Sequence, residues 1–417
     1  MKKNNEYDVA VIGAGPAGMM AAIAAAESGA SVVLIEKNAI GGKKLLLTGG
    51  GRCNLTNAEF NLRSLVANYG ANGSFLYHGF SEFGPQDVIV FFNGLGVETV
   101  AENKKRVFPK KGQAQEVLDA LMKHMGSLGI EMMFESPVTG FEKKGNLAGP
   151  VVLGSGQTIS AKNYVIATGG KSHPATGSAG DGYGWARGLG HEISAPLPGL
   201  VPIRTNEDWA KKLSGASLAD PEIKVLQGDK KILTVLGEVL FTHFGLSGPA
   251  ILNISAEIGK LMEKGDVSVS INLFPEKSRD QAEKMILEIF SKNPNRVLKN
   301  CLWDIMPQGL ALAVSELAGV VPEKTANNIT KEERRRLAGI VCDMRLTVAG
   351  LLDIEAGMVT NGGVSLKGVD DKTMRSKIMS NLFFAGEIID VHGRTGGFNL
   401  QQCWSTGHLA GTSAARS

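Results

Sequence analysis

Residues 9–18 read V-A-V-I-G-A-G-P-A-G, a short apolar run that continues directly into a Gly-x-Gly-x-x-Gly turn. The run is rich in β-branched residues and ends at glycine, so it predicts a buried parallel strand, and the alanine-rich residues 19–28 predict the helix that follows. Gly13 permits the tight turn, Gly15 lets the backbone approach a pyrophosphate, and Gly18 lets helix and strand pack closely. The stretch therefore predicts an α/β fold with a phosphate site at a helix N-terminus.

A second apolar run, residues 31–35, ends at Glu36. Glu36 lies roughly 20 residues after Gly13, the spacing at which an acid accepts hydrogen bonds from the hydroxyl groups of an adenosine ribose. The alternative is an ordinary glycine turn followed by a surface glutamate, because glycine-rich turns are common in α/β proteins. The two features together predict a bound dinucleotide.

The composition suits a globular chain of two or three domains, because 417 residues exceed the usual length of one domain. Lys and Arg number 44 against 41 Asp and Glu, so the net charge of +3 gives no basic footprint and we expect no nucleic-acid partner. No uninterrupted apolar span reaches about 18 residues, so we expect no membrane span. The oligomeric state is left open.

Four cysteines, at positions 53, 301, 342 and 403, lie far apart and form no Cys-x-x-Cys pair. We therefore expect no disulfide framework, no zinc site and no other metal site. This cysteine usage fits the reducing cytoplasm, which is the expected location.

A second glycine-rich segment, residues 48–57, reads T-G-G-G-R-C-N-L-T-N. Three consecutive glycines between Thr48 and Arg52 predict a backbone cradle for an anion, and Lys44 adds a charge that balances phosphate. The alternative is a flexible surface loop, but the second half of the segment offers many directed hydrogen-bond donors. Cys53 has no second cysteine nearby, so we expect it to pack against a cofactor.

Patterns typical of a dinucleotide-binding fold occur at both ends of the chain, with a different texture between them. Residues 164–170 predict a buried strand that ends in glycine, and residues 382–387 predict another that leads into a terminal helix through residue 414. Short alternating runs in the middle predict an antiparallel sheet or barrel, at residues 201–204, 223–226, 232–236 and 267–273. Helical patterns occupy residues 85–95, 113–128, 183–189, 278–291, 309–317 and 331–338. Asp181 is placed to cap the helix predicted at residue 183.

With these motifs in view, the chain resembles a bacterial three-domain FAD-dependent oxidoreductase family. The family includes the aminoacetone oxidase-like enzymes and the BaiN-like flavoprotein reductases proposed to act on bile-acid enones. The resemblance covers essentially the whole chain and rests on residues 13–18, residues 48–57, G-L-S-G-P-A at residues 245–250, and residues 386–401. One departure is H-G-R at residues 392–394, where the family usually carries Asp-Gly, so substrate preference is not carried over.

The resemblance and the patterns together imply an α/β fold in four parts. A Rossmann-type FAD-binding domain is built from both chain ends, residues 1–194 and 346–417. The middle holds an inserted β-rich, barrel-like domain, residues 195–274, and a helical sub-domain, residues 275–345.

The resemblance also implies non-covalent FAD. Residues 13–18 would hold its pyrophosphate, Glu36 its ribose, and the Val138 backbone would pair with adenine. Gly386 and Glu387 would meet the ribityl chain and pyrophosphate, and the N–H groups of Asn399 and Leu400 would face the pyrimidine end of the isoalloxazine. The candidate cofactor-binding residues are Gly13, Ala14, Gly15, Ala17, Gly18, Glu36, Lys37, Lys44, Thr48, Gly49, Gly50, Arg52, Cys53, Asn54, Val138, Thr168, Gly169, Gly170, Gly386, Glu387, Gly397, Phe398, Asn399 and Leu400.

A dedicated NAD(P)H domain is not predicted, because the middle of the chain shows no second Gly-x-Gly-x-x-Gly unit. Electrons would then come from a transiently docked NAD(P)H, from the substrate or from another protein. His392 and Arg394 are the candidate catalytic residues, since a histidine and a fixed cation beside a flavin-facing loop can hold a carboxylate or polarise a carbonyl. His173 and His243 also lie next to glycine loops, and a structural role is the alternative for each histidine.

The leading hypothesis is an FAD-dependent oxidoreductase that transfers hydride through flavin N5, with NAD(P)H-linked reduction of a small organic substrate such as an enone. A carbonyl-polarising pair suits this direction slightly better than an oxygen-using amine or aminoketone oxidase, which stays as the alternative. A flavin-dependent RNA-modifying enzyme and a non-catalytic flavin sensor also stay open.

Overall fold

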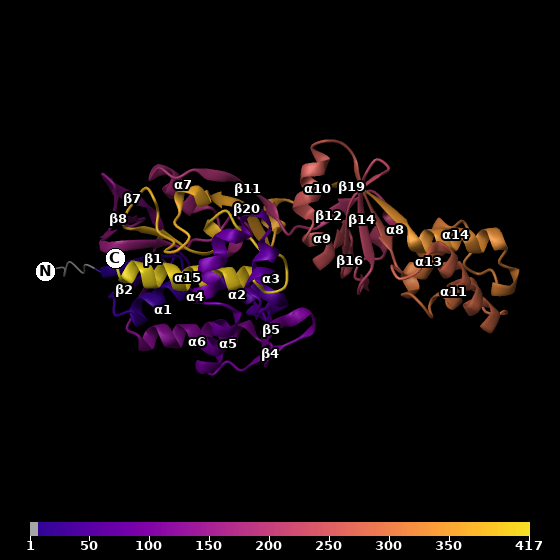
Figure 1. The fold of residues 1–417 in the computed structure, drawn as a ribbon, viewed down its shortest axis with the longest axis horizontal. Coiled ribbons are helices and arrows are strands. Elements are labelled where there is room, and N and C mark those ends of the chain that lie inside the picture. The colour runs from indigo at the N-terminus through magenta and orange to yellow at the C-terminus, as the bar shows by residue number, and fades with distance from the viewer. Residues whose placement is uncertain (1–6) are drawn as a thin grey trace. The chain divides into compact units, whose positions relative to one another are not determined.

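A computed structural model describes residues 7–417, which divide into two compact units (Figure 1). Unit 1 runs to Gly199 and resumes at Ile354, and unit 2 is Leu200–Asp353. The domain limits predicted at residues 194 and 345 lie a few residues before the observed boundaries, which follow Gly199 and Asp353. Strand β11 (Ile193–Gly199) pairs with β20 (Val359–Val364) inside unit 1, a long-range pairing that a change of sequence texture does not reveal.

Unit 1 is organised around a five-stranded parallel sheet in the order β21-β10-β1-β2-β6. Its strands are β1 (Tyr7–Ile12), β2 (Val32–Ile35), β6 (Glu131–Met133), β10 (Ala161–Ile166) and β21 (Leu382–Phe384). The strand predicted from residues 9–12 is thus at the centre of the sheet, where Val9 and Val11 are fully buried. Because β21 pairs with β10, both ends of the chain contribute to one sheet, as predicted.

The helices of unit 1 cover this sheet and close its ends. They are α1 (Pro16–Glu27), α2 (Lys43–Leu47), α3 (Leu62–Val66), α4 (Tyr77–Glu82), α5 (Pro85–Gly94), α6 (Ala114–Ser127), α7 (Asp181–Gly188) and α15 (Phe398–Ala415). Helix α1 begins three residues before the predicted start because Pro16 suits the first helical position, whose N–H has no partner in the helix. The terminal helix α15 packs against α1, and a Cβ on Gly411 would lie only 2.1 Å from the Ala21 carbonyl oxygen.

Besides the β11–β20 pair, the described part of unit 1 contains two three-stranded antiparallel sheets, which were not predicted as sheets. One consists of β3 (Thr56–Asn57), β4 (Thr99–Ala101) and β5 (Arg106–Pro109), and the other of β7 (Val138–Lys144), β8 (Leu147–Leu153) and β9 (Thr158–Ile159). Strand β7 starts at Val138, the residue for which the family resemblance implied a short side strand.

Unit 2 contains an eight-stranded antiparallel sheet and a group of helices with a hydrophobic core of their own. In sheet order the strands are β13 (Ser217–Leu218), β16 (Val239–Thr242), β17 (Gly245–Ser247), β12 (Ile203–Thr205), β19 (Met344–Leu351), β18 (Val267–Asn272), β14 (Glu222–Gln227) and β15 (Lys230–Leu236). The helices are α8 (Asp208–Lys212), α9 (Pro249–Leu252), α10 (Ser255–Met262), α11 (Arg279–Lys292), α12 (Leu298–Leu302), α13 (Gln308–Leu317) and α14 (Lys331–Cys342). These elements confirm the predicted β-rich insertion with helices after it.

The G-L-S-G-P-A segment has a structural reason to be rich in glycine. Gly245 adopts a φ of +149° and a Cβ there would lie 2.4 Å from the Ile203 carbonyl oxygen, so the pairing of β17 with β12 requires glycine.

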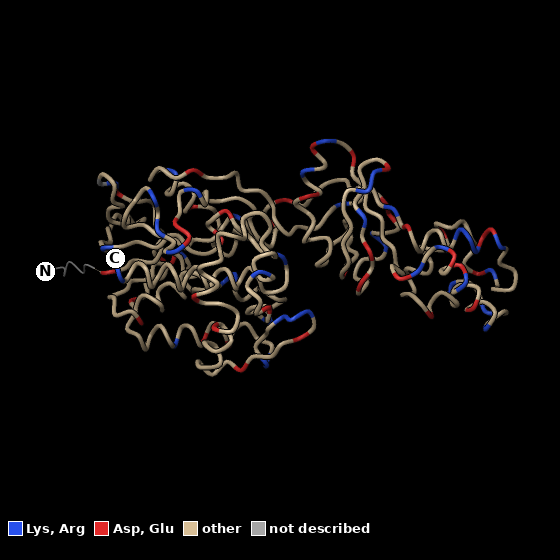
Figure 2. Tube along the Cα trace, in the orientation of Figure 1, with Lys and Arg blue, Asp and Glu red and all other residues tan. Residues whose placement is uncertain are grey.

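Basic and acidic residues are interspersed along unit 2 (Figure 2). Between residues 7 and 417, the structure contains no helix with the length and apolar character needed to cross a membrane.

Candidate cofactor site

Unit 1 has a cavity at the carboxyl ends of its parallel strands, with about 1190 Å³ of empty space when its mouth, which is open to solvent, is included. The residues that follow four strands line it directly: Gly13 after β1, Glu36 after β2, Thr168 after β10 and Ala385 after β21. Ligands of open α/β sheets bind at this edge, where the chain connections change direction. The cavity is therefore the candidate cofactor site.

The three glycines of the first turn differ in what surrounds them, as the sequence predicts. Gly13 has a φ of +102°, and a Cβ there would lie 2.6 Å from the Ala167 carbonyl oxygen. Gly15 has open space where a Cβ would stand, so its backbone is accessible to a ligand. A Cβ on Gly18 would lie 1.8 Å from the Gly13 carbonyl oxygen, so helix α1 can approach the turn only because this residue is glycine.

Glu36 is buried at the cavity wall and both of its carboxylate oxygens accept hydrogen bonds. The Ala14 N–H donates to Oε2 at 2.8 Å, and the Asn38 N–H and side-chain amide donate to Oε1 at 2.9 and 2.6 Å. The carboxylate is thus fixed against the glycine turn. A carboxylate has about four acceptor positions, so it retains capacity for a ribose hydroxyl.

The prediction that Asp181 caps helix α7 is wrong. The N-cap is Gly180, and the Asp181 carboxylate accepts from Lys37 Nζ at 2.5 Å instead. Both residues line the cavity, and an ion pair to a residue far away in the chain is something that local cap patterns do not reveal.

The segment T-G-G-G-R-C-N-L-T-N divides into two parts. Thr48 lines the cavity, while Gly49 and Gly50 form a left-handed turn with φ of +59° and +67°. Arg52 forms an ion pair with Glu102 and lies 4.2 Å from the centre of the Phe108 ring. The structure therefore does not bring the Arg52 guanidinium to the cavity wall.

The second half of this segment holds the beginning of helix α15. Asn57 donates from its side chain to the Gly396 carbonyl at 3.0 Å, Thr56 Oγ1 donates to Gln401 Oε1 at 2.5 Å, and Trp404 Nε1 donates to the Leu55 carbonyl at 2.9 Å. The motif thus positions a helix that itself lines the cavity.

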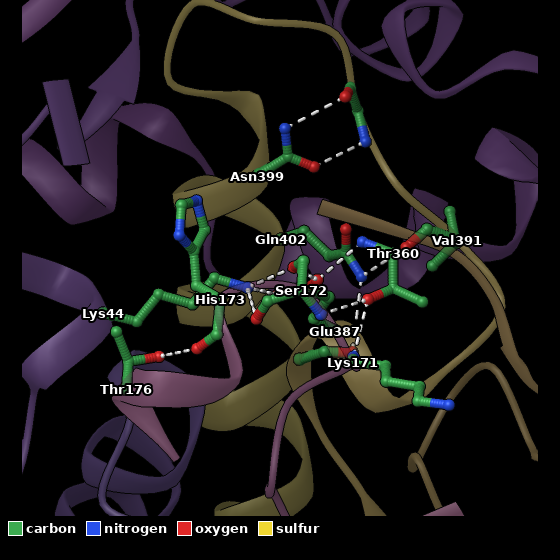
Figure 3. Close-up of polar contacts among 12 residues, drawn as sticks. Lys44, Lys171, Ser172, His173, Thr176, Thr360, Glu387, Val391, Asn399 and Gln402 are labelled. Atoms are coloured by element: carbon green, nitrogen blue, oxygen red, sulfur yellow. Dashed lines mark hydrogen bonds and ion pairs between the residues drawn. The ribbon is translucent and has the colours of Figure 1, made fainter. Parts of the chain in front are cut away.

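Helix α15 directs its N-terminus to the cavity. Its N-cap is Gly397, with φ of +100°, and Asn399 and Leu400 in its first turn line the wall. The Asn399 side chain accepts from the Gly393 N–H at 2.8 Å and donates to the Gly393 carbonyl at 3.0 Å (Figure 3). The first turn contains no acidic side chain, so its N–H groups favour an electron-rich ligand atom.

A polar network joins four segments beside the cavity (Figure 3). Lys44 Nζ donates to Glu387 Oε2 and to Ser172 Oγ, at 2.7 Å each. Ser172 Oγ and the Thr360 N–H donate to Glu387 Oε1 at 3.0 and 2.7 Å. Glu387 therefore fixes Lys44 and the loop after β10, and its carboxylate is occupied by protein groups.

The predicted cofactor residues separate into two groups. Those at the cavity wall are Gly13, Ala14, Gly15, Ala17, Glu36, Lys37, Lys44, Thr48, Val138, Thr168, Gly169, Glu387, Asn399 and Leu400. Those that the structure places behind or beside the wall are Gly18, Gly49, Gly50, Arg52, Cys53, Asn54, Gly170, Gly386, Gly397 and Phe398.

Sequence reasoning missed other residues of the wall, among them Asn38, Ser136, Thr176, Gly177, Ser178, Asp181, Trp185, Met358, Val359, Gln402 and Cys403. The glycine-rich run at residues 176–182 carried a usable signal, since Gly177 and Gly180 both require positive φ. Met358 and Val359 lie in no recognisable motif.

The two candidate catalytic residues lie on the loop that leads into α15 and are not at the cavity wall. Arg394 is exposed, its N–H donates to the Asn68 carbonyl at 3.0 Å, and its carbonyl accepts from the Asn399 side chain at 3.2 Å. Its guanidinium forms no ion pair with any residue that the structure describes. His392 is half-buried beside it.

Neither cysteine near the site is a reactive thiolate. Burial raises the pKa of the Cys53 and Cys403 thiols to about 12 in each case. Cys403 lines the cavity, and Cys53 is fully buried behind it, so both act as packing residues.

The residues of the wall suit a dinucleotide. Two helix N-termini meet the wall, the open face of Gly15 borders it, and the buried Thr168 Oγ1 at the wall has no hydrogen-bond partner among the described residues. An unpaired buried hydroxyl is a group that a bound ligand would satisfy.

Comparison with known proteins identifies relatives over the whole chain. The family described as HI0933-like protein Rossmann domain matches residues 7–413. The chain is 31% identical over 410 residues to a 3-dehydro-bile acid delta(4,6)-reductase from Clostridium scindens, covering 98% of each protein. It is 31% identical over 402 residues to a ribosomal RNA dihydrouridine synthase from Escherichia coli, covering 96% of each.

Among solved structures, a 3-ketosteroid delta1-dehydrogenase from Sterolibacterium denitrificans is similar in fold. The TM-score is 0.56 and the sequence identity is 12%, with 99% of this chain and 100% of that one covered. The predicted Rossmann-type α/β fold is therefore confirmed.

Proposed function

Since the chain belongs to the family of HI0933-like proteins and is an FAD-dependent oxidoreductase, we propose that it reduces a carbon–carbon double bond conjugated with a carbonyl group, using NAD(P)H as a transient donor. The substrate that we propose is a small organic molecule of the enone class. When bound, FAD supplies a two-electron carrier that accepts hydride from one partner and passes it to another.

One observation carries this proposal: two relatives that span nearly the whole chain have names that denote the same bond chemistry. A delta(4,6)-reductase acts on double bonds in a 3-oxo compound, and a dihydrouridine synthase saturates a ring double bond that is conjugated with a carbonyl. Both names indicate addition of two hydrogen atoms to such a bond.

The cavity supports this chemistry by what its walls can do. Residues Gly13–Gly15 and the α1 N-terminus would hold the pyrophosphate of FAD, and Glu36 would bind a ribose hydroxyl. The N–H groups at the start of α15 would stabilise negative charge on the ring system. His392 and Arg394 lie outside the wall, on the adjoining loop, and would contact a part of the substrate that extends beyond the cavity.

Reduction of uridine in RNA is a second candidate function, because the E. coli dihydrouridine synthase is 31% identical to the chain, as is the bile acid reductase. The two matches cover 96% and 98% of the chain. The near balance of 44 basic and 41 acidic residues gives no strong electrostatic footprint for RNA, so we rank it second.

Anaerobic mixing of the FAD-loaded protein with NADH or NADPH tests the donor, and we expect the flavin absorbance to bleach. The reduced protein is then offered a 3-oxo-Δ4 steroid and, separately, a uridine-containing rRNA fragment. Reoxidation by the steroid, with two hydrogen atoms gained, supports the first function, whereas reoxidation by RNA supports the second. Bleaching by an amine, with reoxidation by oxygen alone, would establish an oxidase instead.

Arg394→Ala tests the substrate-facing loop. We expect FAD content to stay intact and turnover to fall by at least about tenfold, which is about 1.4 kcal/mol of lost transition-state stabilisation. Stopped-flow measurements decide, since equal rates in the two proteins would make Arg394 a scaffold residue.

A further inference from the structure

His173 has a backbone conformation that side chains rarely adopt. Its φ of +52° lies in the left-handed region, which is unfavourable for a residue other than glycine. The Thr176 N–H and Thr176 Oγ1 both donate to the His173 carbonyl, at 2.9 and 2.7 Å, and keep the strained turn in place. Strain of this kind persists where the direction of a side chain matters.

The residues around His173 fix its position beside the cavity. The preceding residue, Ser172, is fully buried and bonded to Lys44, Glu387 and Thr360. His173 is not itself a residue of the cavity wall, but the side chain of the preceding Ser172 bonds to two residues of that wall, Lys44 and Glu387. His173 therefore lies directly beside the cavity.

The His173 ring itself forms no hydrogen bond with the residues that the structure describes. Figure 3 shows the imidazole clear of the dashed network, on the side of the view where Asn399 lies. Burial, and then the positive charge of Lys44, lower the pKa of the imidazole below its usual 6.5, while Glu387 opposes the shift. This shift favours the neutral ring, which carries one N–H that can donate.

We propose that His173 is a catalytic residue that donates this hydrogen bond to the carbonyl oxygen of the substrate. The inference rests on the reductase function proposed above. A neutral imidazole that is held in place can polarise a carbonyl, because its N–H is stronger as a donor when part of the solvent is excluded.

The substrate group that we consider is a conjugated C=C–C=O group. The hydride, with its electron pair, adds to the carbon distant from the carbonyl, with the reduced flavin as the donor. The π electrons move to the carbonyl oxygen, where the His173 N–H stabilises the enolate. A proton from solvent then adds to the carbon next to the carbonyl, which completes the saturated product.

Binding of 4-nitrophenol to the oxidised, FAD-loaded protein tests this role without turnover, because its phenolate oxygen resembles an enolate. We expect His173→Ala to weaken binding at least about tenfold, and His173→Gln, which keeps an N–H donor, to stay within about threefold. His124→Gln is the matched control. The His124 ring, on α6, lies 3.0 Å from the Glu27 carboxylate, and its replacement should not affect binding. Melting temperature and flavin content, measured on each variant, should not change.

Turnover of the steroid provides the second readout, where we expect kcat to fall at least about tenfold in His173→Ala while the rate of flavin reduction by NADPH is unchanged. Equal 4-nitrophenol affinity in wild type and His173→Ala, or no binding to the wild type, would overturn the inference. Absence of steroid turnover in the wild type would instead refute the proposed function, and the binding comparison would still decide the role of His173.

Discussion

The Glu36 carboxylate accepts a hydrogen bond from the Ala14 N–H of the glycine turn, and it also lines the cavity. Its place was predictable from spacing alone, since the ends of neighbouring parallel strands meet at one edge of a sheet. The clamp by Asn38 was not predictable, because it depends on the side-chain orientation of a residue in no motif.

Glu36→Ala should weaken FAD binding by roughly 1.5–3 kcal/mol, since a charged hydrogen-bond acceptor for the ribose is lost. Titration of the apoprotein with FAD, followed by flavin fluorescence, measures the change. Glu98→Ala, on an exposed side chain paired with Lys110, is the control. An unchanged dissociation constant in Glu36→Ala would remove Glu36 from the ribose role.

His191 is a buried residue whose charge should affect stability. It is 3% exposed, its Nε2 lies 2.8 Å from Ser376 Oγ, and burial lowers its pKa from 6.5 to about 4. The unfolded chain therefore binds a proton more readily than the folded one between these values. The free energy of unfolding should fall as the pH drops from 6.5 towards 4, by on the order of 2–3 kcal/mol from this residue.

His191→Gln should reduce that slope, and urea unfolding at pH 7 and pH 4.5 measures it in both proteins. An identical pH slope in wild type and His191→Gln would show that His191 is protonated without cost in the folded state.

Among the elements, those predicted well are the ones whose buried residues form a continuous apolar segment of the sequence. Strand β1 and helix α1 are continuous apolar segments bounded by glycine, so local patterns suffice to predict them. Strands β3, β4 and β9 have only two or three residues, too few for an alternation to be detected, and their pairing is set by tertiary contacts. The same limit applies to the site. Met358 and Val359, at the start of β20, line the cavity but belong to no motif.

Gly411→Ala should destabilise unit 1 by about 1–3 kcal/mol, because its Cβ would enter the backbone of α1 and the two helices would have to separate. Gly126→Ala is the matched control on α6, where a Cβ would meet nothing within 4 Å and alanine should add up to about 1 kcal/mol of helix stability. Thermal and urea unfolding compare the two. Equal stability of Gly411→Ala and wild type would mean that α15 can move away from α1 at no cost.

At the scale of the molecule, each unit brings together its own two points of chain entry and exit. In unit 2, the Leu352 N–H donates to the Pro202 carbonyl at 3.1 Å, so the two ends of its chain lie together. In unit 1, the chain leaves after Gly199 and returns at Ile354. Gly199 pairs with Val359, so these two points lie close together. All residues of the cavity wall belong to unit 1.

Replacement of residues 200–353 by a short Gly-Ser linker should therefore leave a protein that still binds FAD, because the linker needs to span only a short distance. Flavin absorbance after gel filtration measures retention. A second deletion that also removes β20 should lose FAD, since Val359 lines the cavity. A colourless product of the first deletion would show that the cavity needs unit 2 to form.

The division of the central sheet between the two chain ends has a consequence for synthesis. When unit 2 has left the ribosome, the growing polypeptide still lacks β21 and α15, and with them Ala385, Asn399 and Leu400 of the cavity wall. At about 5–20 residues per second, the part from Ile354 onward takes on the order of 3–13 s to make. Throughout that interval the nascent chain presents its glycine turn without the opposing wall. We therefore expect stable capture of the cofactor only after the start of α15 has been made, and a chain that stops before Asn399 should retain flavin poorly.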